Sequence, residues 1–355
     1  PLNITFNDDG VCSGCTIHEE KNEINWEQKL LRLKKIIEPY KKSSRSINNC
    51  IVPVSGDRDS YFIVYIVKDI LGMNPLIVNY NNHYNTKIGI RNLSFLKTLQ
   101  GCNYLNLTVQ PQKVKKITFS TLRNFGSMYW HCIAGQTVLP VQIACKFKIP
   151  LIFWGAHQGI DQVGMFSHHD EVEMTRKYRK EHDLMGFEAE DLLKIDNSLT
   201  EEDVEPYIYP HDQEIEDVGV RGIYLNNYFR WDSKAQHELM INKYSYETKQ
   251  LVRTFDCYNN VSCFHYTGTH DYIKFLKHGY SVVTDHVNRE IRLNRISRKQ
   301  GGKLISHFSN QKFEDLEIFL KWLSINKKDF IKIIDKHINK KILFKKENEW
   351  YLKKE

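Results

Sequence analysis

The sequence predicts an α/β fold in which helices cover both faces of a doubly wound parallel sheet. Two observations lead to this prediction. Short apolar segments of strand length alternate with segments whose apolar residues recur at helical spacing. One apolar run also ends in a Ser-Gly turn, and a helix-like run follows it directly. The expected strands are 50–54, 75–80, 103–109 and 150–154, and the expected helices are 61–71, 88–99, 112–125 and 138–147.

The chain divides by composition into three parts. Residues 1–45 hold a Cys-x-x-Cys segment and an amphipathic helix over 26–40, before a Ser-rich linker. Residues 46–218 carry the strand and helix alternation and are expected to form a nucleotide-binding α/β domain. Residues 219–355 are aromatic-rich and then mostly helical, and are expected to contact the substrate or a partner.

Composition indicates a globular protein. Apolar residues make up 41% of the 355 residues and charged residues 26%. The longest apolar run, 61–67, is too short to span a bilayer and no secretory signal opens the chain, so we expect a cytoplasmic protein without a transmembrane segment. Of the net charge of +7, residues 326–355 supply +5, from ten Lys and five acidic residues. A charged chain end is usually solvated, so we expect no nucleic-acid binding.

Cys12 and Cys15 follow a turn at 8–10, as the two thiolates of half a zinc knuckle would. This spacing predicts a Zn²⁺ site. A redox dithiol and two unrelated buried cysteines are the alternatives. The two further ligands are expected from a cysteine pair upstream of Pro1, or from Cys257, Cys263 and His265.

The segment 50–60 predicts a phosphate-binding corner between a strand and a helix. Such a turn directs backbone N–H groups and the positive end of the helix dipole at one spot. Gly56 permits close approach of a ligand, and Asp57 and Asp59 are expected to hold Mg²⁺. The loop resembles the Ser-Gly-Gly-x-Asp-Ser loop of the PP-loop ATP pyrophosphatases, with Asp57 in place of the second glycine. An ordinary polar turn is the alternative. The predicted nucleotide-binding residues here are Ser55, Gly56, Asp57, Arg58, Asp59 and Ser60.

The loops after the other strands are expected to converge on this corner, because ligands bind at the carboxyl ends of strands in doubly wound sheets. Asn79 and Gly155 are assigned to the nucleotide site and Asp161 to its magnesium. His157 is a candidate to donate a hydrogen bond to a phosphate or to an intermediate. A glycine turn with polar surface residues is the alternative interpretation.

A predicted helix near residue 290 sets an acid and a histidine among arginines. Arg289, Arg292 and Arg295 fall three apart, so neighbours share a face and can bind a carboxylate or phosphate of the substrate. Asp285 and His286, with Asp59 and His157, are the catalytic candidates, because general acid–base chemistry requires groups within reach of the reacting atoms. A solvated basic helix is the alternative.

To about residue 310 the sequence resembles the N-acetyl sugar amidotransferases of bacterial surface-polysaccharide biosynthesis, which have a PP-loop or HUP-like α/β fold. The stretches that carry the resemblance are PLNITFNDDGVCSGC, IVPVSGDRDS, IPLIFWGAHQGIDQVGMFSHHDEVEMTRKYRKEHDLMGFEAEDLL, HDYIKFLKHGY and TDHVNREIRLNRISR. They are most similar to the O-antigen enzymes that act on a nucleotide-linked diacetamido uronic acid.

This resemblance implies an ATP-dependent chemistry. ATP would adenylate the oxygen of a sugar acetamido group, ammonia would attack the imidate carbon, and AMP would leave an acetamidino group. Ammonia would come from a separate glutaminase with a synthase-like partner. Two other functions remain open from the residues: a PP-loop tRNA-modifying enzyme of the thiolation or lysidine type, and a non-catalytic scaffold of the glutaminase complex.

Overall fold

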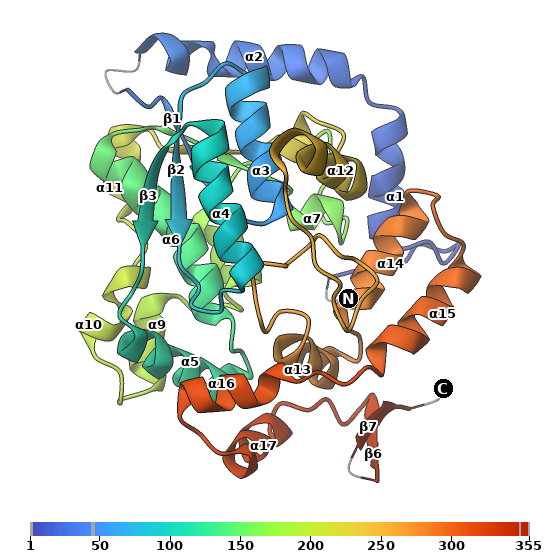
Figure 1. The fold of residues 1–355 in the computed structure, drawn as a ribbon. Coiled ribbons are helices and arrows are strands. Elements are labelled where there is room, and N and C mark those ends of the chain that lie inside the picture. Colours follow the sequence, from blue (N-terminus) through green and yellow to red (C-terminus); the bar gives the residue numbers. More distant parts are fainter. Residues whose placement is uncertain (1–2, 44–46, 348, 354–355) are drawn as a thin grey trace.

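A five-stranded parallel sheet forms the centre of the molecule (Figure 1). The computed structural model describes residues 3–43, 47–347 and 349–353. The strand order is β3-β2-β1-β4-β5, so the chain winds outward from β1 first in one direction and then in the other. This is the doubly wound topology that the sequence predicts. The strands are β1 (Cys50–Pro53), β2 (Pro75–Tyr80), β3 (Asn103–Leu107), β4 (Leu151–Trp154) and β5 (Arg221–Tyr224).

The edge strand β5 was not predicted from the sequence. It has four residues, and an arginine and a glycine take two of these positions, so it lacks an apolar run. It pairs in parallel with β4 over Leu151↔Arg221 to Trp154↔Tyr224. The sheet therefore extends beyond residue 218, where the predicted α/β domain ends. The three-part division of the chain stays a prediction.

Helices cover both faces of the sheet, and neighbouring strand residues enter different cores. Val52 of β1 belongs to a cluster with α3 and α12, whereas Ile51 belongs to one with α5 and α6. This placement follows from the alternation of side chains along a strand. The flanking helices are α3 (Arg58–Tyr65), α4 (Lys87–Gln100), α5 (Pro111–Phe125), α6 (Trp130–Phe147) and α12 (Ser233–Tyr244).

The helix after β1 starts earlier than predicted. Asp57 is the residue before its first turn, and α3 begins at Arg58. Ser60, which directly precedes the predicted helix over 61–71, is already helical. The helix then widens into a π-helix, η2 (Ile66–Ile70), and ends before Gly72, whose φ of 63° suits glycine.

The remaining helices of this part of the chain precede β1, connect β4 to β5 or follow β5. The amino-terminal helices are α1 (Ser13–Glu19), η1 (Glu20–Asn22) and α2 (Trp26–Ser43). Those between β4 and β5 are α7 (Gln158–Asp161), α8 (Arg176–Tyr178), η3 (Arg179–Asp183), α9 (Ala189–Ile195), α10 (Glu201–Val204), η4 (Glu205–Tyr207) and α11 (Asp212–Val218), and η5 (Leu225–Asn227) follows β5.

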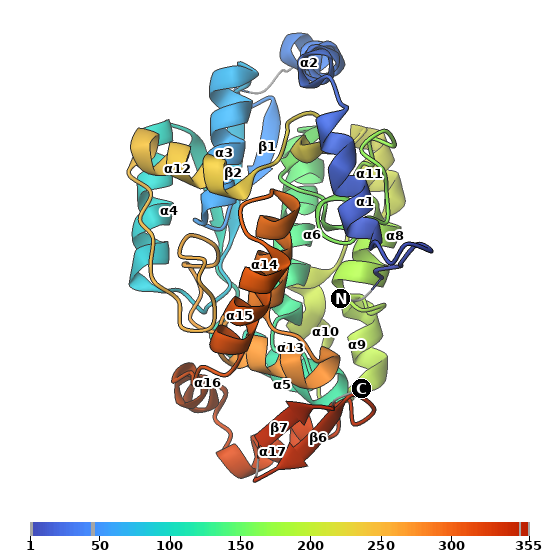
Figure 2. The same cartoon turned by 90° about the vertical axis from the view of Figure 1, so that its right-hand side faces the viewer.

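The carboxyl-terminal region packs around a third apolar cluster, which also takes residues from α5 and α6. Figure 2 shows α14 in front of the sheet and the β6–β7 hairpin at the lower end of the molecule. No helix within the described residues is both long and apolar enough to cross a bilayer. The elements of this region are α13 (Thr269–His278), α14 (Val282–Arg292), α15 (Arg298–Ser309), α16 (Asp315–Leu323), α17 (Lys327–Asp335), β6 (Leu343–Lys346) and β7 (Glu349–Leu352).

Candidate functional site

The loop between β1 and α3 closes tightly on itself. Gly56 has a φ of 87°, in the left-handed region that favours glycine, and a Cβ there would lie 3.1 Å from the Gly89 carbonyl oxygen. The backbone N–H of Ser55 donates to Oγ of Ser60 at 2.8 Å. Ser60 therefore lies inside the helix, and its hydroxyl accepts the hydrogen bond that fixes the start of the loop.

Asp57, which takes the place of the second glycine, turns away from the loop opening. Its carboxylate accepts hydrogen bonds from the backbone N–H of Ser262 at 3.1 Å and from the Ser262 hydroxyl at 2.7 Å. Burial raises the pKa of Asp57 to about 6, although the bonds from Ser262 oppose this rise. The carboxylate thus joins the loop to a segment 200 residues later, and it is not directed at a phosphate group or a metal.

A cavity of about 500 Å³ opens at the carboxyl ends of the strands. It brings together residues that the sequence predicted from three separate segments. The predicted residues that line it are Arg58, Asp59, Asp161, Asp285, His286, Arg289 and Arg292. Among the lining residues that were not predicted are His18, Lys21, Tyr178, Asp183, Asn259 and Lys274.

Two of the predicted magnesium ligands are bound by cations of the chain. Arg58 Nη1 lies 2.7 Å from Asp59 Oδ1, and Lys21 Nζ lies 2.6 Å from Asp161 Oδ1. Lys21 is almost completely buried, and its charge is the main cause that lowers the pKa of Asp161 against the opposing effect of burial. Groups of three or more metal-binding side chains are absent from the described residues. These carboxylates do not form a ready Mg²⁺ site in this structure.

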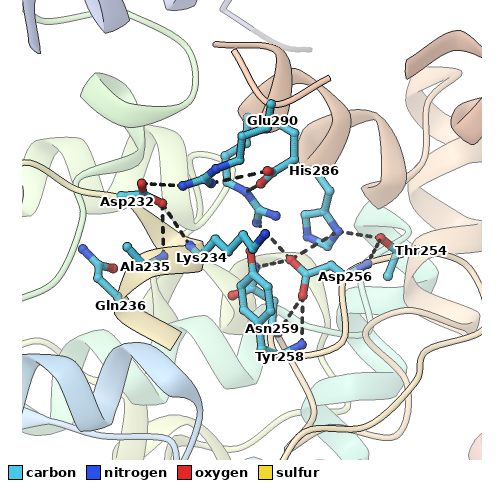
Figure 3. A network of polar contacts seen from close by, with 12 residues as sticks. Asp232, Lys234, Ala235, Gln236, Thr254, Asp256, Tyr258, Asn259, His286 and Glu290 are labelled. Atoms are coloured by element: carbon cyan, nitrogen blue, oxygen red, sulfur yellow. Dashed lines mark hydrogen bonds and ion pairs between the residues drawn. The ribbon is translucent and has the colours of Figure 1, made fainter. Parts of the chain in front are cut away.

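A buried carboxylate, Asp256, organises one wall of the cavity (Figure 3). Its Oδ2 accepts from Arg289 Nη1 at 2.9 Å and from Asn259 Nδ2 at 2.8 Å, and it lies 3.8 Å from His286 Nδ1. Asn259 in turn accepts from Arg58 Nε at 2.7 Å. One carboxylate therefore connects α14 to the loop after β1.

Tyr258 lies between the two cations of this wall. The guanidinium carbon of Arg58 is 5.5 Å from the ring centroid of Tyr258, and that of Arg289 is 5.4 Å from it. Burial opposes it, but interactions with His286 and Arg289 and the backbone N–H groups of Asn259 and Tyr258 hold the pKa of Asp256 well below its usual range. The Asp256 charge in turn raises the pKa of Arg289. The wall is therefore charged and fixed in place before any ligand arrives.

His286 has the properties of a neutral base. Burial lowers its pKa to about 4, although the charge of Asp256 opposes this decrease. Its Nδ1 lies 2.6 Å from Oγ1 of Thr254. The imidazole is thus uncharged at neutral pH and lines the cavity in a fixed orientation. Its neighbour Asp285 also lines the cavity and pairs with Lys274.

The three predicted substrate arginines do not act as one group. Helix α14 ends at Arg292, and the left-handed Asn294 (φ 55°) separates it from Arg295. Arg289 and Arg292 line the cavity, whereas Arg295 lies outside it and pairs with Asp232 at 2.5 Å. The expectation of a single helix through all three was therefore wrong.

Arg292 differs from the other cavity cations because no carboxylate neutralises it among the described residues. Its Nη1 donates to the backbone carbonyls of Gln162 at 2.8 Å and of Asp161 at 3.3 Å. Its Nε is buried without a hydrogen-bond partner in the described part of the chain. This guanidinium retains the net positive charge that an anionic ligand requires.

Asn79 and Ser55 lie in a second, smaller cavity of about 270 Å³, beside the ends of β1 and β2. Asn79 donates from Nδ2 to the Val54 carbonyl at 2.7 Å and accepts from Tyr104. Several asparagine side chains line this cavity, which is separate from the larger one. The other lining residues include Asn81, Asn82, Asn85, Gly89, Leu93 and Asn106.

The loop after β4 has a different arrangement from the predicted one. Gly155 is a close-packing position, because a Cβ there would lie 2.9 Å from Ile63 Cδ1. His157 is buried among the rings of Phe166, Tyr178 and Tyr224, at centroid distances of 5.5, 4.3 and 4.6 Å. Burial lowers its pKa to about 4. His157 is not among the residues that line the larger cavity, and its catalytic role stays a prediction.

The predicted zinc knuckle is not formed by the described residues. The Sγ atoms of Cys12 and Cys15 are 3.3 Å apart, but no further metal ligand joins them in that part of the chain. The Tyr129 hydroxyl donates a hydrogen bond to Cys263 Sγ, and His265 Nδ1 lies 2.7 Å from Asp315 Oδ2. These side chains are therefore committed to the third apolar cluster and its edge, and do not reach the cysteine pair.

A family model for the C-terminal domain of the LPS biosynthesis protein WbpG-like family matches residues 236–355. This segment is therefore similar to the C-terminal domain of the WbpG-like proteins, and it makes up about a third of the chain. The match supports the resemblance to enzymes of bacterial surface-polysaccharide biosynthesis. A search of curated proteins gave no significant match.

Two solved structures show distant similarity. An NH3-dependent NAD synthetase from Campylobacter jejuni, in complex with nitrate, is 13% identical, with a TM-score of 0.32 over 64% of this chain and 100% of that one. An NMN synthetase from Francisella tularensis is 14% identical, with a TM-score of 0.29 over 62% of this chain and 96% of that one.

The segment that matches the WbpG-like domain supplies 13 of the 30 residues that line the larger cavity. Asp256, His286, Arg289 and Arg292 belong to it, whereas Arg58 and the other loop residues come from the preceding part of the chain. Sequence reasoning missed Asp256 because its neighbours form no regular element. It missed Lys21 because a lysine in a charged stretch resembles a solvated one. The signal available for Asp256 was the aromatic and polar run from 254 to 265 in an otherwise charged region.

Proposed function

We propose that the protein is an ATP-dependent amidotransferase of surface-polysaccharide biosynthesis. It would convert an acetamido group of a nucleotide-linked diacetamido uronic acid to an acetamidino group. The observation that carries the proposal is that the PP-loop-like segment, with Arg58 and Asp59, opens into one cavity with His286 and Arg289 of the WbpG-like domain. A phosphate site and a WbpG-like wall thus enclose the same space.

The geometry supports binding of the ATP phosphates at the start of α3. The first turn of a helix presents unpaired N–H groups and a positive dipole end. Because Asp57 is tied to Ser262, its charge is directed away from this turn. Arg58 and Arg289 lie on either side of Tyr258 and are each paired with a carboxylate, so they would contribute hydrogen-bond donors to the phosphates and the departing pyrophosphate and not a net charge.

The reaction begins when the acetamido oxygen attacks the α-phosphorus of ATP. The bond to pyrophosphate breaks, and the amide N–H loses its proton to give a neutral O-adenylated imidate. His286 is suited to accept this proton, because its neutral imidazole lines the cavity. Ammonia then adds to the imidate carbon, and the carbon–oxygen bond to AMP breaks with its electron pair leaving on AMP. The product is an amidinium group.

The substrate's carboxylate or diphosphate would bind Arg292, the cavity cation without a carboxylate partner among the described residues. Ammonia would come from a separate glutaminase and its synthase-like partner, as the family resemblance implies. Mg²⁺ is expected to arrive with ATP, but we assign no step to it, because Asp59 and Asp161 are paired with Arg58 and Lys21. A role for Zn²⁺ is not part of the proposal.

The test is a reaction of the purified chain with ATP, Mg²⁺, ammonium chloride and a nucleotide-linked diacetamido uronic acid, analysed by mass spectrometry. The expected product has one oxygen replaced by NH and forms together with AMP and pyrophosphate. A control without the sugar should give no AMP. An unchanged sugar with no AMP would overturn the proposal, and ADP in place of AMP would exclude adenylation.

A further inference from the structure

Among the residues that the structure describes, one carboxylate that lines the larger cavity, Asp183, has no ion-pair partner. The other three carboxylates that line the cavity are paired, Asp59 with Arg58, Asp161 with Lys21 and Asp285 with Lys274. Asp183 has neither a hydrogen bond nor an ion pair to any residue that the structure describes. A single negative charge of this kind on a cavity wall suits a small cation.

The backbone directs Asp183 into the cavity by an irregular turn. Helix α8 passes into the π-helix η3, which ends at Asp183. A π turn inserts an extra residue into a helix and often occurs at functional sites. The turn is closed by hydrogen bonds from the Leu184 N–H to the Arg179 carbonyl at 2.9 Å and from the Gly186 N–H to the Lys180 carbonyl at 2.8 Å. The position of the carboxylate is therefore fixed by the backbone.

The surroundings of Asp183 are poor in compensating charge. Arg179, whose charge lowers the pKa of Asp183 against the effect of burial, pairs with Glu188 at 3.2 Å and donates to Thr137 at 2.8 Å. The carboxylate also acts on the hydroxyls of Tyr178 and Tyr224, whose pKa values it helps to raise. Burial raises the pKa of Asp183 to about 6, so the group exchanges a proton near neutral pH.

We propose that Asp183 binds ammonium on the cavity wall and removes its proton, so that ammonia is formed beside the adenylated sugar. This inference rests on the proposed function, which needs neutral ammonia at a pH at which ammonium predominates. The carboxylate takes one proton from ammonium and becomes a carboxylic acid. Ammonia keeps its lone pair for attack on the imidate carbon, and the proton later passes to water. The aromatic ring of Tyr178 beside the site would also favour a bound cation.

The test separates the step that uses ATP from the step that uses ammonia. Wild type, Asp183→Asn and the control Glu181→Gln, an exposed carboxylate on the same π turn, are compared in two assays. The first is sugar-dependent exchange of pyrophosphate into ATP without ammonia. The second is formation of the amidine from ammonium chloride, and it is repeated with hydroxylamine, which is largely neutral at the same pH.

Asp183→Asn is expected to keep the exchange rate within about twofold and to lose roughly 100-fold or more of the ammonium-dependent rate. Hydroxylamine should restore product formation, because it needs no deprotonation. Ammonium-dependent turnover as fast as in wild type would overturn the inference. Loss of pyrophosphate exchange in both Asp183→Asn and Asp183→Ser would overturn it as well, because Asp183 would then be needed for ATP binding or for folding. If wild type itself shows neither exchange nor product, the proposed function fails and not the role of Asp183 alone.

Discussion

At the scale of single residues, the substitution of Asp57 for a glycine is explained by its bonds to Ser262. A glycine at this position would leave the loop without its connection to the later segment. The Asp57 carboxylate stabilises the loop, because both of its oxygens accept hydrogen bonds from Ser262. Its burial also makes the stability of the protein depend on pH.

Asp57→Asn is predicted to reduce the pH dependence of stability between about pH 4 and pH 6. Asp57 has a raised pKa in the folded state, about 6 against an ordinary 3.8. The contribution of Asp57 to stability is therefore fully present at pH values below the pKa of the unfolded state, 3.8, and it is lost as the pH rises through 6. The difference in unfolding free energy between wild type and variant should change by up to about 3 kcal/mol over this window. Urea unfolding at several pH values measures it, and a constant difference would contradict the assignment.

The charge of Asp256 holds together one wall of the larger cavity, through Arg289 and Asn259. Asp256→Asn is predicted to destabilise the protein by roughly 3 kcal/mol, because Arg289 loses one of its two carboxylate partners and keeps only Glu290. The KM for ATP should rise together with a lower kcat, since Arg58 loses its support through Asn259. Thermal unfolding and steady-state kinetics check this, with the exposed Glu238→Gln as control. Unchanged kinetics in a destabilised variant would show that Asp256 is only structural.

At the scale of elements, the end of α14 decides which arginines reach the cavity. Arg292→Gln is predicted to raise the KM for the nucleotide-linked sugar at least about tenfold, which corresponds to roughly 1.4 kcal/mol of binding. Arg295→Gln is the matched control, because Arg295 lies outside the cavity. Its KM should stay near that of wild type. Equal increases in KM for both variants would instead support the prediction from the sequence that these arginines bind the substrate together.

Elements with strong patterns were predictable from the sequence, and their ends were not. The four predicted strands follow from their apolar runs and helices such as α5 follow from periodicity, because burial of one or both faces imposes these patterns. The short β5 and the break after Arg292 depend on tertiary pairing and on a left-handed Asn294, which no periodicity records. The candidate site was predictable at its loops. Its connecting residues, Lys21 and Asp256, become visible only through their partners.

At the scale of the whole molecule, one cavity is built from segments that lie far apart in the chain. The loop after β1, the start of the chain and the WbpG-like domain meet there, and no single segment has the full set of groups. ATP binding is therefore predicted to slow hydrogen exchange in α3 and α14 together, while the β6–β7 hairpin at the far end stays unchanged. Exchange measured by mass spectrometry with and without ATP and Mg²⁺ tests this coupling. Protection of α3 alone would contradict a shared site.

The central claim is that ATP adenylates the acetamido oxygen of the sugar, and an isotope experiment tests it most directly. The nucleotide-linked diacetamido uronic acid is labelled with oxygen-18 in its acetamido carbonyl and incubated with the protein, ATP, Mg²⁺ and ammonium. The AMP is expected to carry the label, because the bond between that oxygen and phosphorus survives when ammonia displaces AMP. Unlabelled AMP, or label released only into water, would contradict O-adenylation.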